Sequence, residues 1–215
     1  FENFSKHNSK HKVLIIQNDI RCKAEFYKKI KYIKNKYNLD IRTYCNSNLR
    51  ELGSWWKAYS LFPSEEWYCF VHDNMFLKFN AEEKVLGGKK VFALATINGW
   101  RGEHHKNYSW GKKHLKLLQI KNPSPIVIFG CSFICSNDIM KSLKEKGVFN
   151  IIAKTRAEAT NSERILGIIF RDMNLDIVTG TKIIPSHKND KGVASMKNPV
   201  RTSTPLFDKI RSARK

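Results

Sequence analysis

The residues best suited to chemistry in this chain are His72, Asp73 and Asn74, which follow an apolar, aromatic-rich run. Residues 68–71 predict a buried strand, because aromatic and β-branched side chains fit a sheet that is covered on both faces. A carboxylate at the end of such a strand is costly to bury unless it is hydrogen-bonded, paired or bound to a metal. Ligands of open α/β sheets also bind at the carboxyl ends of strands. The pattern therefore indicates a ligand or metal site at Asp73, with a turn-capping aspartate as the alternative.

Polar residues near two other expected strands are further candidates for binding a nucleotide. Gln17 and Asn18 end the first strand and suit hydrogen bonds to a base or ribose, although a plain strand exit is the slightly favoured interpretation. Asp40 lies close to the start of the second strand and could make similar contacts. Lys57 lies on an expected helix from which it could reach a diphosphate. A strand-edge acid and a solvated helix lysine are the alternative interpretations of these two.

The elements that must position these residues alternate between strands and helices. Continuous apolar runs predict strands, and apolar side chains at helical spacing predict helices. The expected strands cover residues 11–18, 39–44, 68–71, 91–97, 125–135 with an interruption at Gly130, and 175–184. The expected helices cover residues 20–37, 49–61, 137–146 and 161–173, with Asn137 or Asp138 capping the third and Ser162 the fourth. The polar segment 98–114 predicts a long loop, either functional or disordered.

This order predicts an α/β fold, a single Rossmann-like domain with a mixed, mostly parallel central sheet flanked by helices. We expect residues 1–187 to form the domain and residues 188–215 to form a basic tail, flexible or docked on the surface. The first strand is not followed by GxGxxG, and no GxxxxGK[ST] occurs, which argues against a dinucleotide site and against a P-loop.

The composition limits the partners and the compartment. The 215 residues include 39 Lys and Arg but 19 Asp and Glu, so the net charge of +20 predicts attraction to polyanions. Five cysteines without framework spacing indicate reduced thiols and a cytoplasmic protein. No apolar run is long enough to span a bilayer, so we expect no transmembrane segment, while peripheral membrane contact stays open.

Four places within residues 12–187 together resemble the nucleotide-sugar glycosyltransferases of the GT-A fold. The triplet at residues 72–74 is similar to the DXD metal motif of that family. Residues 125–135, with the helix that follows, are similar to the strand and glycine segment lining the acceptor side. Ser162-Glu163-Arg164 resembles the xED element that carries the catalytic base, and His187 resembles a late histidine that some members use as a metal ligand.

The resemblance implies transfer of a sugar from a nucleotide-sugar donor to an acceptor hydroxyl, assisted by a divalent metal. It implies that Asp73, Asn74 and His187 hold Mn²⁺ or Mg²⁺, that His72 and Asp73 contact the donor, and that Glu163 is the base. The chain offers one carboxylate where a full DXD offers two, and with one base and no second carboxylate nucleophile it leans toward an inverting displacement. A helix N-terminal acid, favoured by the helix dipole, is the alternative interpretation of Glu163.

Two other classes of protein stay open. A nucleic-acid-binding or nucleic-acid-modifying protein would explain the charge of +20 directly through phosphate contacts, although no helix-turn-helix, RRM or zinc pattern is present. The two interpretations merge if the acceptor is anionic, such as a polysaccharide or modified DNA. The other open class is a non-catalytic adaptor with a Rossmann-like fold. If Asp73 and Glu163 lie in one cleft, the glycosyltransferase interpretation is favoured. If they lie far apart, that interpretation is excluded.

Overall fold

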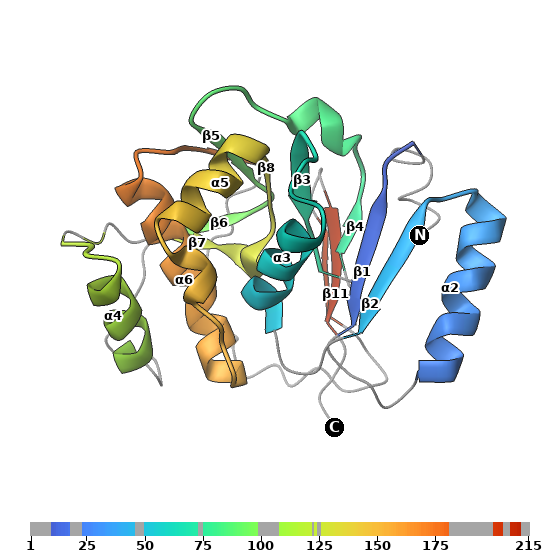
Figure 1. The fold of residues 1–215 in the computed structure, drawn as a ribbon, viewed down its shortest axis with the longest axis horizontal. Coiled ribbons are helices and arrows are strands. Elements are labelled where there is room, and N and C mark those ends of the chain that lie inside the picture. The colour runs from blue at the N-terminus through green and yellow to red at the C-terminus, as the bar shows by residue number, and fades with distance from the viewer. Residues whose placement is uncertain are drawn as a thin grey trace.

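The computed structural model describes residues 10–17, 23–45, 50–72, 75–98, 108–121, 123, 126–180, 200–203 and 207–211. Within them helices and strands alternate, so the expectation of a mixed α/β protein is confirmed (Figure 1). The strands are β1 Val13–Gln17, β2 Ile41–Cys45, β3 Trp67–Phe70, β4 Met75–Leu77, β5 Lys90–Ala93, β6 Thr96–Asn98, β7 Ile126–Ile128, β8 Phe133–Ser136, β9 Asp176–Thr179, β10 Val200–Ser203 and β11 Phe207–Arg211. The helices are α2 Lys23–Tyr37, α3 Arg50–Leu61, α4 Tyr108–Leu117, α5 Asn137–Glu145 and α6 Arg156–Asp172, with short 3-10 turns η1 Ala81–Lys84, η3 Phe129–Cys131 and η4 Val148–Asn150.

The strands in the described part of the chain form several small sheets rather than one. The central sheet has the order β3-β8-β5-β9, beside the pairs β1-β2 and β6-β7 and the three-stranded sheet β10-β11-β4. β8 runs antiparallel to β3 and β5, while β5 and β9 are parallel. The sheet is mixed, as expected, but the expectation that it is mostly parallel is wrong. β7 pairs antiparallel with β6, and β8 pairs antiparallel with β5. Apolar runs in the sequence do not reveal this pairing.

β1, α2 and β2 form a parallel βαβ unit at one end of the molecule. β1 and β2 pair in register from Val13 opposite Ile41 to Gln17 opposite Cys45. Parallel neighbours need a crossover connection, and α2 supplies it. In Figure 1 this unit lies to the right of α3 and β3, with α2 outermost.

The core lies on both faces of the central sheet. Phe133 of β8 is fully buried, with its ring centroid 5.0 Å from that of Phe70 and 5.2 Å from that of Phe170. α3, α5 and α6 cover this face and bury it. On the opposite face Ile134 packs in a second cluster with Leu77 of β4, Phe92 of β5 and residues of the segment around η1. Alternate residues of β8 thus enter different cores, as the period of a strand requires.

α4 corrects the expectation of a long loop, because residues 108–117 are helical. The helix is buried at Gly111 and Leu115. A Cβ atom placed on Gly111 would lie 3.7 Å from Ile165 of α6, so the small residue lets the two helices approach closely. The few apolar residues of α4 do not predict a helix by themselves, and its packing on α6 supplies the stabilisation.

Part of the expected basic tail belongs to a sheet. β11 pairs antiparallel with β4 and also with β10. The segment after residue 187 therefore contributes a strand beside β4, which apolar patterning did not indicate. Among the described residues, no helix has both the length and the apolar character needed to cross a membrane.

Candidate functional site

His72 lies two residues beyond β3 and is fixed by the turn that precedes β8. Its Nε2 lies 2.6 Å from the carbonyl oxygen of Gly130. A carbonyl only accepts hydrogen bonds, so Nε2 must carry the proton in this contact. The imidazole is half-buried and meets the ring of Trp55 edge-on, with centroids 6.1 Å apart. Only Nδ1 of His72 could therefore bind a metal, and the ring position is set before any ligand arrives.

The turn at Gly130 and Cys131 fixes the surroundings of His72. Both residues adopt left-handed backbone conformations, with φ of 63° and 49°. Their carbonyl groups are used in succession, since Gly130 accepts from His72 and Cys131 accepts from Nε1 of Trp55 at 2.9 Å. The Trp55 ring also stacks on Phe70. α3 and the turn thus hold the end of β3 from two sides, and Trp55 has a positioning role.

Replacing Gly130 by alanine is expected to lower the free energy of unfolding by roughly 1–2 kcal/mol, because a Cβ atom is unfavourable in the left-handed region. Urea unfolding measures the change. Gly87→Ala is the matched control, since its φ lies outside that region and an added Cβ meets no atom within 4 Å. Equal stability of the Gly130→Ala variant and the unmodified protein would contradict the proposed strain.

β1 and β3 run side by side in the same direction. At their beginnings Lys12 forms an ion pair of 3.0 Å with Glu65, and the His11 ring meets that of Trp67 at 5.0 Å. Further along, both strands line one cleft of about 510 Å³. The strands β1, β2 and β3 therefore end at the same edge, which we call the carboxyl edge. Open α/β sheets bind ligands at this kind of edge.

The cleft between β1 and β3 has apolar walls and charged residues of both signs. Val13, Leu14, Phe70 and other apolar side chains form the walls. Lys10 and Glu65 are among the charged residues that line the cleft, and Lys10 is ion-paired. The apolar walls suit a flat apolar group.

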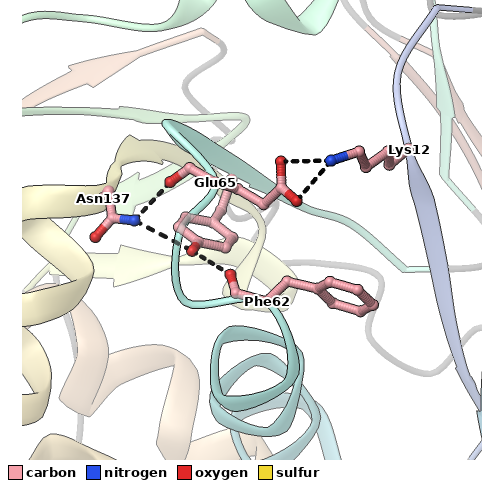
Figure 2. Close-up of polar contacts among 5 residues, drawn as sticks. Lys12, Phe62, Glu65 and Asn137 are labelled. Atoms are coloured by element: carbon pink, nitrogen blue, oxygen red, sulfur yellow. Dashed lines mark hydrogen bonds and ion pairs between the residues drawn. The ribbon is translucent and has the colours of Figure 1, made fainter.

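Figure 2 shows polar contacts around the loop before β3, at the end opposite the carboxyl edge. Asn137 donates to the Glu65 carbonyl at 2.5 Å, and the Tyr68 hydroxyl donates to the Phe62 carbonyl at 2.6 Å. Burial raises the pKa of Tyr68, so the phenol stays protonated and remains a donor. Asn137 is therefore a structural residue that ties α5 to the loop before β3. The cap of α5 is Ser136, one residue before the expected cap.

The other donor-site candidates divide between the two edges. Gln17 ends β1 at the carboxyl edge. Lys57 of α3 places its Nζ 4.9 Å from the ring centroid of Tyr44, one residue before the end of β2, and so also lies there. Asp40 is exposed and precedes β2, with its carbonyl accepting from Val13 at 2.8 Å. The structure therefore brings Gln17, Lys57 and His72 to one edge and leaves Asp40 at the opposite one. Asn18 lies outside the described residues.

Glu163 lies inside α6 rather than at its start. The helix begins at Arg156 behind a capping box, in which the Thr155 side chain accepts from the Glu158 N–H and the Glu158 carboxylate accepts from the Thr155 N–H. Partial burial opposes ionisation of Glu158, but these backbone hydrogen bonds outweigh it and lower its pKa. Ser162 is buried and donates to the Glu158 carbonyl, so its expected role as a cap is wrong. The N-terminal-acid interpretation of Glu163 fails with it.

The direction of α6 shows at which end of the central sheet Glu163 lies. Gly167 lies against Ile126, and Phe170 packs on Phe133. α6 therefore runs in the same direction as the chain from β7 to β8. Glu163 precedes Gly167 by one turn, so the half-buried carboxylate lies on the part of α6 that extends beyond the start of β8.

The end of β3 extends to the same side. Phe70 is the register partner of Phe133, and β3 is antiparallel to β8. The chain leaves Phe70 toward His72, while the segment before Phe133 leads back to Gly130. His72 and Glu163 therefore both lie beyond the Phe70–Phe133 layer on one side of the molecule.

Arg164 stands next to Glu163 in an unusual environment. The guanidinium is half-buried, and its Nη1 donates to the Thr160 carbonyl at 2.7 Å. Burial lowers the pKa of Arg164, and attraction to the Glu163 carboxylate opposes this change. Its buried Nε has no hydrogen-bond acceptor among the residues that the structure describes. Arg164 therefore adds positive charge beside Glu163.

The metal candidates Asp73, Asn74 and His187 lie outside the described residues. The part of the chain that the structure describes contains no group of three or more His, Cys, Asp or Glu side chains able to hold a metal. One carboxylate, one amide and one or two imidazoles fit Mn²⁺ better than Mg²⁺, because nitrogen ligands favour the softer ion. The fixed Nε2 of His72 leaves that ring one coordinating atom at most.

The fold and this edge define a mixed α/β protein with a polar site where its parallel strands end. Comparison of the chain with protein-family models, curated proteins and solved structures found no match in any of the three. The site's chemistry therefore has to be inferred from its own residues.

Proposed function

We propose that this protein is a glycosyltransferase that moves a sugar from a nucleotide-sugar donor to an acceptor hydroxyl. The observation that carries the proposal is the fixed imidazole of His72 at the carboxyl edge, held 2.6 Å from the Gly130 carbonyl immediately before Asp73 in sequence. A preorganised polar group next to a carboxylate suits a diphosphate or metal–diphosphate ligand. Lys57 and Gln17 at the same edge add a positive charge and an amide for the donor.

A Rossmann-like GT-A arrangement is part of this proposal. β1 and β3 run side by side across the cleft, so the separate pair β1-β2 lies beside the β3 edge of the central sheet, in the order β2-β1-β3-β8-β5-β9. The donor base enters the apolar cleft between β1 and β3, and the diphosphate lies toward the carboxyl edge. This order supports assignment of residues 1–187 to one catalytic domain, with the strands after residue 187 as additions at β4.

The reaction needs charge stabilisation and a base. Asp73, with Asn74 and His187, would hold Mn²⁺ or Mg²⁺, and the ion when bound supplies positive charge to the departing nucleoside diphosphate. Glu163 accepts the proton of the acceptor hydroxyl as its oxygen attacks the anomeric carbon, and the bond from that carbon to the diphosphate breaks. One displacement inverts the configuration. Arg164 beside Glu163 favours an anionic acceptor.

Asp73→Ala is expected to abolish stabilisation by the donor. A nucleotide sugar at 100 times its dissociation constant adds about 2.7 kcal/mol to the free energy of unfolding. Thermal unfolding with UDP-, GDP-, ADP- and CMP-sugars, each with and without Mn²⁺, identifies the donor. We expect one nucleotide to raise the unfolding temperature in the presence of Mn²⁺ and to lose this effect in the variant.

The control for this experiment is Glu83→Ala, which removes an exposed carboxylate of η1. It should retain the shift. A shift that survives in Asp73→Ala would overturn the metal role of Asp73, and no shift with any donor would overturn the proposed function.

A nucleic-acid-binding function is the second candidate, and α2 favours it. Lys28, Lys31 and Lys34 are exposed on this helix, where Glu25 is the sole acid. Exposed Tyr32 on the same helix could stack on a base. Salt-sensitive binding to an oligonucleotide, together with no response to nucleotide sugars, would favour this function over glycosyl transfer.

A further inference from the structure

Arg164 is a half-buried cation with which the residues that the structure describes form no ion pair. Arginine is almost never buried without a partner, because its charge loses hydration. Glu163 attracts the guanidinium, but the effect of burial is larger and the pKa of Arg164 is lowered. The positive charge is therefore only partly compensated, and an anion that binds beside it would be stabilised.

The three nitrogens of this guanidinium differ in their surroundings. Nη1 donates to the Thr160 carbonyl at 2.7 Å, which fixes the orientation of the group. Nε is shielded from solvent and has no acceptor among the described residues. Nη2 is the remaining nitrogen, and it can donate to a ligand. Carboxylate and phosphate oxygens form the strongest hydrogen bonds with a guanidinium, because both partners are charged.

The position of Arg164 follows from its neighbours on α6 and β7. Gly167 is three residues later, so it is next to Arg164 on the helix surface, and it lies against Ile126 at the start of β7. Ile126 is the register partner of Asn98, the last residue of β6. Arg164 therefore lies beyond the end of β6 and the start of β7, on the side of the molecule where Glu163 lies.

We propose that Arg164 binds an oxyanion of the acceptor, the carboxylate or phosphate group of an anionic sugar. The identity of this ligand as an acceptor rests on the proposed function, in which Glu163 is the base. Nη2 donates to an oxygen of the anion while the neighbouring Glu163 accepts the proton of a hydroxyl group on the same sugar. A neutral sugar leaves the guanidinium uncompensated, so Arg164 selects the acceptor and takes no part in the chemical step.

Binding of three sugars that differ only at carbon 6 tests the proposal without any nucleotide sugar. Glucose, glucuronate and glucose 6-phosphate are titrated into the full chain by calorimetry. We expect an anionic sugar to bind roughly 10- to 100-fold more tightly than glucose, the usual effect of a hydrogen bond to a charged group. Tighter binding of glucuronate identifies a carboxylate acceptor, and tighter binding of glucose 6-phosphate identifies a phosphate acceptor. Equal affinities for the three sugars would overturn the proposal.

Substitutions of Arg164 assign the preference to this residue. Arg164→Met removes the charge and keeps an apolar stem, so the preference for the anionic sugar should disappear. Arg164→Lys should restore only part of it, because an ammonium group lacks the planar fork of a guanidinium. Arg156→Gln, which removes an exposed charge from the same helix, is the matched control and should keep the preference. A preference that survives in Arg164→Met, or that is lost equally in Arg156→Gln, would overturn the proposal.

Thermal unfolding separates this role from a structural one. A half-buried guanidinium without an ion pair contributes little to stability, so Arg164→Met should be at least as stable as the unmodified protein. A large loss of stability would assign Arg164 a structural role instead.

The binding measurement also separates this proposal from the proposed function. Transfer to glucose at the same rate as to the anionic sugars would overturn the role of Arg164 and leave the glycosyltransferase intact. Binding of an anionic sugar through Arg164, with no response to any nucleotide sugar, would overturn the glycosyltransferase and leave an oxyanion site at Arg164.

Discussion

Replacing Gly167 by alanine is expected to lower the free energy of unfolding by about 3 kcal/mol or more, at the upper end of overpacking effects. A Cβ atom on Gly167 would lie 2.2 Å from the carbonyl oxygen of Ile126 and 2.8 Å from its Cγ2. The first neighbour is backbone of β7 and cannot rotate away, so α6 would have to move off the sheet. Alanine favours a helix by about 1 kcal/mol over glycine, which is too small to offset the clash.

Gly111→Ala provides the matched control for this prediction. Gly111 also lies in a helix packed against α6, but a Cβ there would stay 3.7 Å from its nearest neighbours. This variant should be as stable as the unmodified protein or slightly more stable. Urea unfolding of both variants decides the matter: equal stabilities would show that α6 does not approach β7 as closely as described. A Gly167→Ala protein that fails to fold would agree with the prediction.

Replacing Glu163 by glutamine is expected to slow sugar transfer about 100- to 10,000-fold, the usual contribution of a general base. The amide keeps the shape of the side chain but cannot accept the acceptor's proton. Donor binding should be unchanged, since the proposal places the donor at Gln17, Lys57 and His72. Release of nucleoside diphosphate, with the donor identified by thermal unfolding, measures the rate.

Glu158→Gln is the control, on the same helix and with the same loss of charge. Glutamine can also complete a capping box, so α6 should keep its start at Arg156. This variant should retain most of the transfer rate. Equal rates for Glu163→Gln and the unmodified protein would exclude Glu163 as the base, and a loss of donor-induced stabilisation would assign it a binding role instead.

The apolar pattern of the sequence predicted most elements because burial and periodicity are local properties. The expected helix at residues 137–146 is confirmed as α5, and Gly147 ends it with a φ of 82°. The interruption expected at Gly130 is confirmed as the turn between β7 and β8. An isolated glycine inside a strand pattern signals a bend or a close backbone approach, and here the turn does fix a functional candidate.

The start of α6 shows why some predictions failed. Both Thr155 and Ser162 are plausible caps by residue type, and each has a glutamate nearby in sequence. The structure uses Thr155, because the Glu158 carboxylate accepts hydrogen bonds from the backbone N–H groups of Lys154 and Thr155. Ser162 is buried in the middle of the helix, where its hydroxyl bonds to the turn before it. The spacing to glutamate, three residues in the box, was the signal that distinguished them.

The sequence by itself determined the alternation of strands and helices, the positive charge and the identity of the polar residues after β1 and β3, since these depend on composition and local period. The tertiary structure alone decided that β8 runs antiparallel, that residues 108–117 form a helix, and that His72 meets Gly130 across 58 positions of sequence. Each of these depends on contacts between segments far apart in the chain. The stabilisation of these features comes from packing and hydrogen bonds between distant segments, which a local sequence pattern does not predict.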